Sequence, residues 1–265
     1  MNNKKLTFFV KITGNINAAC RCLNSIGRQT VKDYEIRAYV YDSEIKASLK
    51  EKYPDVRFFV VENDKKFEEL FNSGLKEIAD GYCMLVEGNS VVAVDAAEEI
   101  LKHEEDFIVF NISKMNAVNK FGKYYSNATL TDEASYIGAV QSVWAFAAKP
   151  SFLIEKDIRF RGFKYPLQAL FMLLCLALAD ATFFIRKSFV YRLAVPAAKP
   201  IDGDFYRRNC ADIRRALRAF TLKGKNKARA EAVRVFALAE IEEIYALPLV
   251  QKIRRIYALI KTIWF

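Results

Sequence analysis

The stretch ADGYCMLVEGNSVV, residues 79–92, joins a short apolar run to a cluster of small and polar residues. Residues 82–86 have the length and composition of a buried strand, and Glu87, Gly88, Asn89 and Ser90 follow directly. Ligands of α/β proteins bind beyond the carboxyl ends of parallel strands. This strand end is therefore expected to line a binding site.

Strand-like and helical segments alternate around this stretch through the first 115 residues. Near-continuous apolar strands in repeated β-α-β units predict a parallel sheet covered on both faces, and right-handed crossovers make it an open, Rossmann-like, twisted sheet. The expected fold class is therefore α/β, with a mostly parallel sheet. The strand candidates are residues 6–12, 34–42, 56–62, 82–87 and 106–113, and the helix candidates are residues 16–26, 43–53, 64–80 and 95–104.

The second half of the chain is less regular. Residues 114–131 are turn-rich and aromatic and predict a hairpin or long loop, whereas residues 183–193 resemble another strand. The apolar core of residues 166–185 is about half the ~20 residues that a membrane span needs, so a buried helix is favoured over a span. A Pro- and Gly-containing boundary at residues 196–204 predicts two domains, 1–195 and 196–265.

Positive charge is concentrated at the C-terminal end. Residues 205–265 hold 14 Lys and Arg against 5 Asp and Glu, which accounts for +9 of the net +10. Such asymmetry indicates an anionic partner surface, either lipid headgroups or nucleic acid. No nucleic-acid-binding motif accompanies the charge, so nucleic acid is not an expected partner.

The last 18 residues, PLVQKIRRIYALIKTIWF, predict an amphipathic helix in the plane of an anionic membrane surface. Apolar residues fall on one face, cations flank it, and a terminal Trp suits an interface. Docking of this helix on the protein's own sheet or on a partner subunit remains an alternative. The residues expected at the membrane are Lys252, Arg254, Arg255, Ile256, Ile260, Lys261 and Trp264.

Cysteine usage and the N-terminus bear on location. The five cysteines are odd in number and match no zinc-site spacing, so reduced thiols in a cytosolic protein are the simplest interpretation. The apolar run near the N-terminus is too short for a signal peptide. The expected location is the cytoplasm, peripherally on the inner face of the plasma membrane.

Several passages, in the right order, resemble the family 2 glycosyltransferases, which have the GT-A fold. LNSIGRQTVKDYEI, residues 23–36, is similar to the family's passage from the first helix to the second strand. NSGLKEIADGYCMLV, residues 72–86, is similar to its Asn-x-Gly-Leu followed by Ala-x-Gly-Glu-Tyr. The resemblance spans about residues 5–195.

The resemblance implies a nucleotide site with a bound metal ion. Nucleotide contacts are expected at Thr13, Gly14 and Asn15 after the first strand, at Asp42 after the second, and at Asn72. Without the resemblance, Asp42 is equally well explained as a helix N-cap or a turn residue.

The family's metal-binding Asp-x-Asp corresponds to Glu87-Gly88-Asn89. One carboxylate and one amide oxygen should hold Mg²⁺ or Mn²⁺ less tightly than two carboxylates, so a weakened metal site is expected. The alternative for Glu87 and Asn89 is the capping of a short turn.

The family's general base is an Asp in a Glu-Asp pair, and here Leu167 or Gln168 occupies that place. No ordinary base remains at this position, although Asp157, Asp180 or His103 could be recruited. The catalytic residue is therefore left unassigned.

Two functions stay open. The resemblance implies transfer of a hexose from a UDP-type nucleotide-sugar to a glycan or lipid-linked acceptor, in cell-surface polysaccharide or glycolipid assembly at the inner membrane face. The weakened metal site and the missing general base also fit a catalytically inactive GT-A module. Such a module would bind nucleotide, glycan or a partner transferase and anchor it at the membrane.

Overall fold

The computed structural model describes residues 4–114, 128–129, 143–163, 167–192, 205–225 and 227–234. Their parts of the chain form two compact units, the first within residues 1–129, 144–160 and 180–196 and the second within residues 130–143, 161–179 and 197–265. The units interleave along the sequence, and the predicted division into domains 1–195 and 196–265 stays a prediction. The predicted membrane-surface residues, Lys252 to Trp264, lie outside the described residues, as does most of the predicted loop at 114–131.

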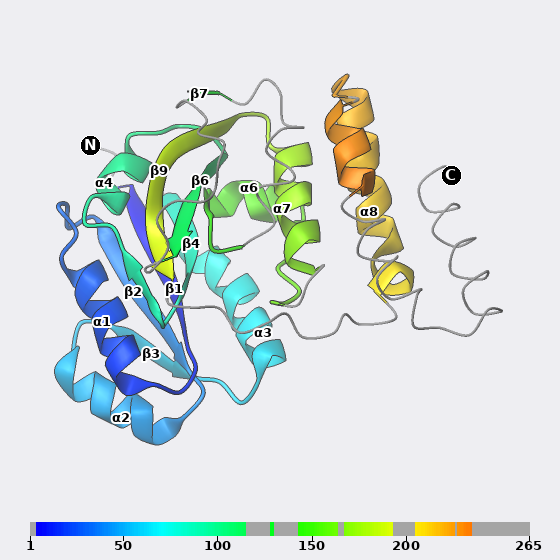
Figure 1. Cartoon of the computed structure of the whole chain (residues 1–265). Helices are drawn as coiled ribbons and strands as arrows, with labels where there is room; N and C mark the ends of the chain where they lie inside the picture. Colours follow the sequence, from blue (N-terminus) through cyan, green and yellow to red (C-terminus); the bar gives the residue numbers. More distant parts are fainter. Residues whose placement is uncertain are drawn as a thin grey trace. The chain divides into compact units, whose positions relative to one another are not determined.

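The described residues contribute nine strands to one sheet, which is the framework of the first unit (Figure 1). Its order is β3-β2-β1-β4-β8-β6-β9-β5, and β7 pairs with β9. The strands are β1 Lys5–Ile12, β2 Tyr34–Val40, β3 Arg57–Val60, β4 Gly81–Glu87, β5 Ser90–Val92, β6 Phe107–Lys114, β7 Ala128–Thr129, β8 Phe146–Ala148 and β9 Thr182–Arg192. The helices are α1 Ile16–Gly27, α2 Ser43–Lys52, α3 Asp64–Gly74, the short 3₁₀-helix Leu75–Glu77, α4 Ala96–Leu101, α6 Pro150–Glu155, α7 Leu167–Leu178 and α8 Phe205–Leu222.

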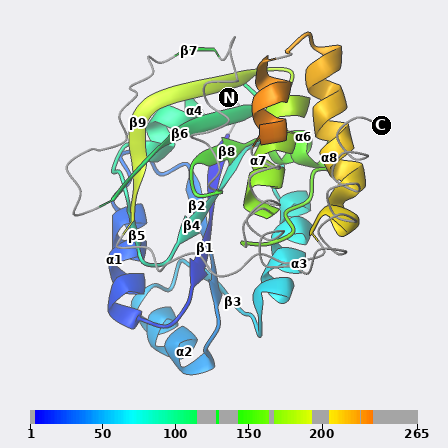
Figure 2. The same cartoon turned by 45° about the vertical axis from the view of Figure 1, so that its right-hand side comes forward.

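Most of the strands run in one direction, which confirms the predicted fold class. β3, β2, β1 and β4 are parallel neighbours, and β6 and β9 are parallel to each other. β8 lies antiparallel between β4 and β6, so β6 and β9 keep the direction of β4. The long, curved β9 pairs with the antiparallel β5 on the side away from β6 (Figure 2). The carboxyl ends of β1, β2, β4 and β9 therefore all lie toward one edge of the sheet.

Alternating side chains of each strand enter different layers. Phe8 belongs to a buried cluster with Leu23 and Ile26 of α1. Its neighbour Phe9 points to the other face, where its ring packs edge-to-face on Phe71 of α3 with 4.7 Å between centroids. Helices thus cover both faces of the sheet, as predicted, and α1 and α3 lie on opposite sides of it (Figure 1).

Helix α3 ends earlier than the predicted helix at residues 64–80. The carbonyl of Gly74 accepts a hydrogen bond from Nη1 of Arg37 at 2.9 Å. The amide of Ile78, which would bond that carbonyl in a continued α-helix, instead reaches the carbonyl of Leu75 at 3.2 Å. The buried guanidinium of Arg37 therefore occupies the carbonyl that would continue the α-helix, and one turn of 3₁₀-helix follows.

Helices α7 and α8 belong to the second unit and pack together. Residues 169–177 of α7 are all buried, which confirms the predicted buried helix. Arg161 pairs with Asp212 of α8 at 2.6 Å, and Nζ of Lys223 donates to the carbonyl of Ala179. Among the described residues, no helix combines the length and the apolar character that crossing a membrane requires.

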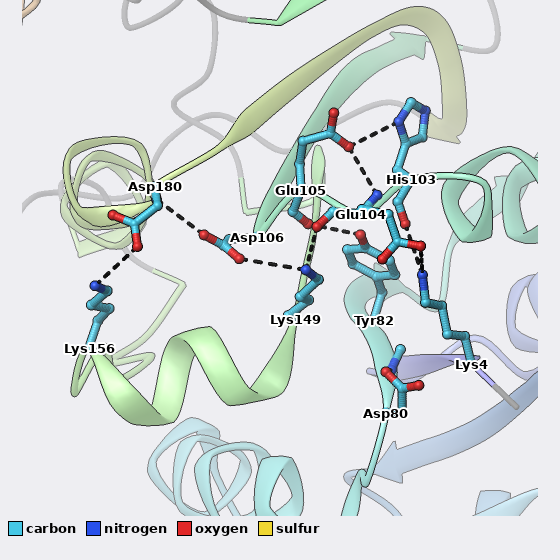
Figure 3. A network of polar contacts seen from close by, with 11 residues as sticks. Lys4, Asp80, Tyr82, His103, Glu104, Glu105, Asp106, Lys149, Lys156 and Asp180 are labelled. Carbon is cyan, nitrogen blue, oxygen red and sulfur yellow. Dashed lines mark hydrogen bonds and ion pairs between the residues drawn. The ribbon is translucent and has the colours of Figure 1, made fainter. Parts of the chain in front are cut away.

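The amino-terminal edge of the sheet carries a polar network (Figure 3). Lys4, just before β1, pairs with Glu104 and also donates to the carbonyl of His103 at 3.4 Å. Lys149, just after β8, donates to the carbonyl of Glu104 and lies 3.7 Å from the carboxylate of Asp106, just before β6. These contacts connect three strands and the loop before β6 at the edge opposite the strand ends of interest.

Candidate functional site

Most of the predicted site residues lie at or just after the carboxyl ends of neighbouring parallel strands. Ile12, the last residue of β1, is in register with Val40 of β2, and Lys11 is in register with Glu87 of β4. With about 4.8 Å between adjacent strands, the ends of β2 and β4 are roughly 10 Å apart across β1. The structure therefore brings the segments that contain Asp42 and Glu87 to one edge of the sheet.

Thr13, Gly14 and Asn15 are exposed in the turn from β1 to α1. Gly14 has φ 89°, a left-handed conformation that glycine adopts readily. The side chain of Asn15 caps α1 by accepting a hydrogen bond from the amide of Ala18 at 3.0 Å. The nucleotide contacts expected at these residues stay a prediction, because the observed contacts explain how the turn is formed and not what it binds.

Asp42 is the N-cap of α2. Its Oδ1 accepts from the amides of Glu44 and Ile45, at 2.7 and 3.1 Å, and the side chain is exposed. This is the capping role that the sequence already offered as the alternative to nucleotide binding. A cap uses one carboxylate oxygen, so the geometry is compatible with a ligand on the other oxygen.

Asn72 clamps the chain that follows α6. Its Oδ1 accepts from the amide of Phe160 at 2.9 Å, while Nδ2 donates to the carbonyl of Phe160 at 2.8 Å and to that of Glu68 at 2.7 Å. Both polar ends of the amide thus have backbone partners. A nucleotide contact at Asn72 would require this clamp to open.

Glu87 is paired with an arginine that sequence reasoning missed. Oε2 of Glu87 accepts from Nε of Arg192 at 2.9 Å and also from Nη2. The guanidinium lies over the ring of Trp144, 5.7 Å from its centroid. Arg192 is the last residue of β9, and no local pattern connects it with a residue 105 positions away.

The turn after Glu87 is held very close to β1. The amide of Gly88 donates to the carbonyl of Lys11 at 2.7 Å, and a Cβ at Gly88 would come within 2.9 Å of that oxygen and 3.1 Å of Cα of Ile12. Next in the chain, Oδ1 of Asn89 and Oγ of Ser90 are buried and have no hydrogen-bond partner among the described residues. The turn therefore holds unused hydrogen-bonding capacity beside Glu87.

The side chains at this strand end do not fit a divalent metal. Hard cations such as Mg²⁺ and Mn²⁺ prefer several oxygen ligands with negative charge. Glu87 supplies one carboxylate, and that carboxylate faces a guanidinium, whose positive charge would repel a cation. Within the described parts of the chain, no group of three or more His, Cys, Asp or Glu side chains is placed to hold a metal ion.

A second polar cluster lies beside the ends of β1 and β2. Nζ of Lys11 is 2.7 Å from Oδ1 of Asp64, and the hydroxyl of Tyr41 donates to the same oxygen at 2.5 Å. On the same helix, burial, reinforced by the negative charge of Asp64, raises the pKa of half-buried Glu68 to about 7. The signal in the sequence was Lys11, a charged residue that interrupts the apolar end of β1.

The candidates for a recruited base lie elsewhere. Nδ1 of His103 is 3.3 Å from Glu105 (Figure 3), and its ring packs on Phe183. The backbone amide of Asp180 bonds the carboxylate of Asp106 just before β6. Both residues therefore belong to the amino-terminal edge, opposite Glu87, because β1, β4 and β6 run in the same direction. Asp157 pairs with Arg159 at 2.9 Å.

Leu167 and Gln168, where the resemblance implied a general base, begin α7, in the second unit. Leu167 has no titratable group, and Nε2 of Gln168 donates to the carbonyl of Phe163. No proton acceptor with a suitable pKa is thus present at these two positions.

No protein-family model matches the chain, and no curated protein sequence matches it significantly. Solved structures do match it. Residues 1–349 of S. aureus TarS superpose with a TM-score of 0.75 at 17% identity, covering 98% of this chain and 81% of that one. The complex of the same protein with UDP-GlcNAc gives 0.74 at 16% identity, with the same coverage.

A more distant match is GalNAc-T7 with UDP, GalNAc and Mn²⁺. Its TM-score is 0.54 at 13% identity, and the match covers 83% of this chain and 48% of that one. Both neighbours are GT-A type glycosyltransferases. The strand order, the helices on both faces and these similarities show that the chain has the GT-A glycosyltransferase fold.

Proposed function

We propose that this chain is a glycosyltransferase that uses a UDP-type nucleotide-sugar. The observation that carries the proposal is the match of nearly the whole chain, 98%, to TarS 1–349, which has been solved with UDP-GlcNAc bound. The carboxyl edge of β1, β2 and β4 supports it, because Glu87 ends β4 and Asp42 comes just after β2, and these two strands flank β1.

In this reaction the acceptor hydroxyl oxygen bonds to the anomeric carbon of the sugar. The bond from that carbon to the diphosphate oxygen breaks, the nucleoside diphosphate leaves, and the hydroxyl proton passes to a base. The turn at residues 13–15 and Asp42 would contact the nucleoside, and the end of β4 would lie near the diphosphate. Family 2 membership would make the acceptor a glycan or a lipid-linked sugar of the cell surface.

A second candidate is a non-catalytic GT-A module that binds nucleotide, glycan or a partner transferase. Two observations favour it: the carboxylate of Glu87 is paired with Arg192, and Leu167 and Gln168 stand at the family's base position. Such a module would keep nucleotide binding and lose transfer.

Binding and turnover separate the two candidates. Calorimetry with UDP measures binding, and free UDP released from a panel of UDP-hexoses, with water as acceptor, measures turnover. Binding with release supports the transferase, and binding without release supports the module. A chain that binds neither UDP nor any UDP-hexose contradicts both.

We further propose that the C-terminal segment holds the protein at an anionic membrane surface. In the described part of the tail, Arg214 and Arg218 of α8 are exposed, and Leu222 is 76% exposed. Each cation near an anionic leaflet contributes about 1 kcal/mol. Removal of residues 249–265 should therefore release the protein from phosphatidylglycerol vesicles. Undiminished co-sedimentation of the shortened chain would assign the anchor elsewhere.

A further inference from the structure

We propose that Arg192 binds the donor's diphosphate in the place where related transferases hold a divalent metal, and that donor binding by this chain is metal-independent. This inference rests on the proposed function. It arises from a difference at the end of β4. The fold implies a bound metal cation there, whereas in this chain the guanidinium of Arg192 supplies the positive charge.

The position of Arg192 is the first step. Two of its N–H groups reach a single oxygen of Glu87, the carboxylate that takes the place of the metal-binding pair. A guanidinium has five N–H donors and matches the oxygens of phosphate well. Glu87 therefore occupies only part of its capacity, and Arg192 can hold Glu87 and a phosphate oxygen together.

The surroundings of Arg192 are the second step. The side chain of Arg192 is 15% exposed and that of Glu87 is 21% exposed, so the pair is largely shielded yet open to a ligand. The ring of Trp144 lies under the guanidinium and restricts its orientation. A shielded, oriented positive charge stabilises the negative charge that develops on a departing diphosphate more than a mobile surface cation does.

The turn next to the pair is the third step. Oγ of Ser90 is buried without a partner in the described chain, and so is Oδ1 of Asn89. Buried polar groups of native proteins usually have a protein, water or ligand partner. Ser90 is in register with Arg192, so its hydroxyl can donate to an anion or to an ordered water beside the guanidinium, whereas Oδ1 of Asn89, an acceptor, would take its hydrogen bond from such a water.

The proposal gives Glu87 a role opposite to that of a metal ligand. A metal-binding Glu87 assists diphosphate binding, so Glu87→Gln would weaken it. A Glu87 that shares Arg192 with the phosphate places a second negative charge beside it and opposes binding. Glu87→Gln should therefore strengthen binding, by about threefold to fivefold for one partly screened charge a few ångströms away.

The experiment is calorimetric titration of the full chain with UDP, uridine and inorganic pyrophosphate, each in EDTA and in ~1 mM Mn²⁺. The wild-type chain should bind UDP in EDTA, with less than about a twofold gain from Mn²⁺. Arg192→Gln should weaken UDP and pyrophosphate by about tenfold or more and leave uridine unchanged. Arg192→Lys keeps the positive charge but loses the paired N–H donors of the guanidinium. Its affinity for UDP and pyrophosphate should therefore fall between those of the wild type and Arg192→Gln.

A matched control comes from the same strand. Lys187 of β9 pairs with Asp95, and its side chain is 49% exposed. Lys187→Gln removes one cation and one ion pair roughly 16 Å along the strand from Arg192, and should leave all three affinities unchanged. An equal loss of UDP affinity in Lys187→Gln would mean that overall charge, and not Arg192, holds the diphosphate, and would overturn the proposal.

The remaining outcomes separate a failure of this inference from a failure of the proposed glycosyltransferase function. UDP binding that requires Mn²⁺ and weakens in Glu87→Gln overturns the role of Arg192 and keeps the transferase. A wild-type chain that binds no UDP under either condition overturns both. If Arg192→Gln fails to fold, judged by circular dichroism, the sign of the Glu87→Gln effect still decides the matter.

Discussion

Substitution of Glu68 by Gln should change how the stability of the protein depends on pH. Burial and the charge of Asp64 raise the pKa of Glu68 in the folded chain from 4.5 to about 7. The folded state therefore binds this proton more tightly than the unfolded state does. The free energy of unfolding consequently falls as pH rises from about 4.5 to about 7, and the loss is complete above the folded-state pKa.

The size of the effect follows from that pKa. A change from 4.5 to about 7 corresponds to roughly 3 kcal/mol at 1.36 kcal/mol per pH unit. Glu68 is only half-buried, so solvent screening reduces this to about 1 kcal/mol. Glu68→Gln should match the wild type at pH ~4, where Glu68 is mostly protonated in both the folded and the unfolded chain, and exceed it by about 1 kcal/mol at pH ~8.

Urea unfolding followed by circular dichroism at the two pH values measures the difference. Glu69→Gln is the control, because Glu69 lies on the same helix, is exposed and pairs only at the surface with Lys66. That change should cost at most ~0.5 kcal/mol at either pH. A Glu68→Gln chain whose offset from the wild type is the same at both pH values would refute the reasoning, since burial would then not control this carboxyl.

Three further changes probe the framework of the site. Arg37→Met should destabilise the chain by about 3–5 kcal/mol in urea unfolding, because Arg37 is buried and its loss leaves polar partners uncompensated; Arg57→Met, whose ion pair is exposed, should cost no more than about 1 kcal/mol. Gly88→Ala should lower the midpoint of thermal unfolding and reduce the free energy of unfolding by about 1–3 kcal/mol, because the added Cβ would press on backbone atoms of β1. An unchanged midpoint would show that β1 and the turn after β4 move apart at no cost. Asn72→Ala should cost about 1–3 kcal/mol and speed proteolysis near Phe160, since the backbone there loses two hydrogen bonds; equal cleavage rates would contradict the clamp.

Prediction from sequence was sound where local patterns carry the information. Alternating apolar and amphipathic segments placed the strands and helices of the sheet, because a strand or helix that buries one face must repeat its apolar residues at a fixed period. The N-cap role of Asp42 was among the alternatives for the same reason, since a cap is read from residues within one turn. The burial of α7 followed from an apolar run too short for a span.

The tertiary structure alone decided how distant residues meet. No periodicity shows that β8 inserts antiparallel between β4 and β6, or that Arg37 ends α3 by taking the carbonyl of Gly74. The same holds for Arg192 and Glu87, which are 105 residues apart and meet because β9 runs parallel to β6 and ends at the edge where β4 ends. Local sequence determines which segments fold and which faces they bury, whereas the charge that stands opposite Glu87 depends on strand order and register, which only the packing of the whole sheet fixes.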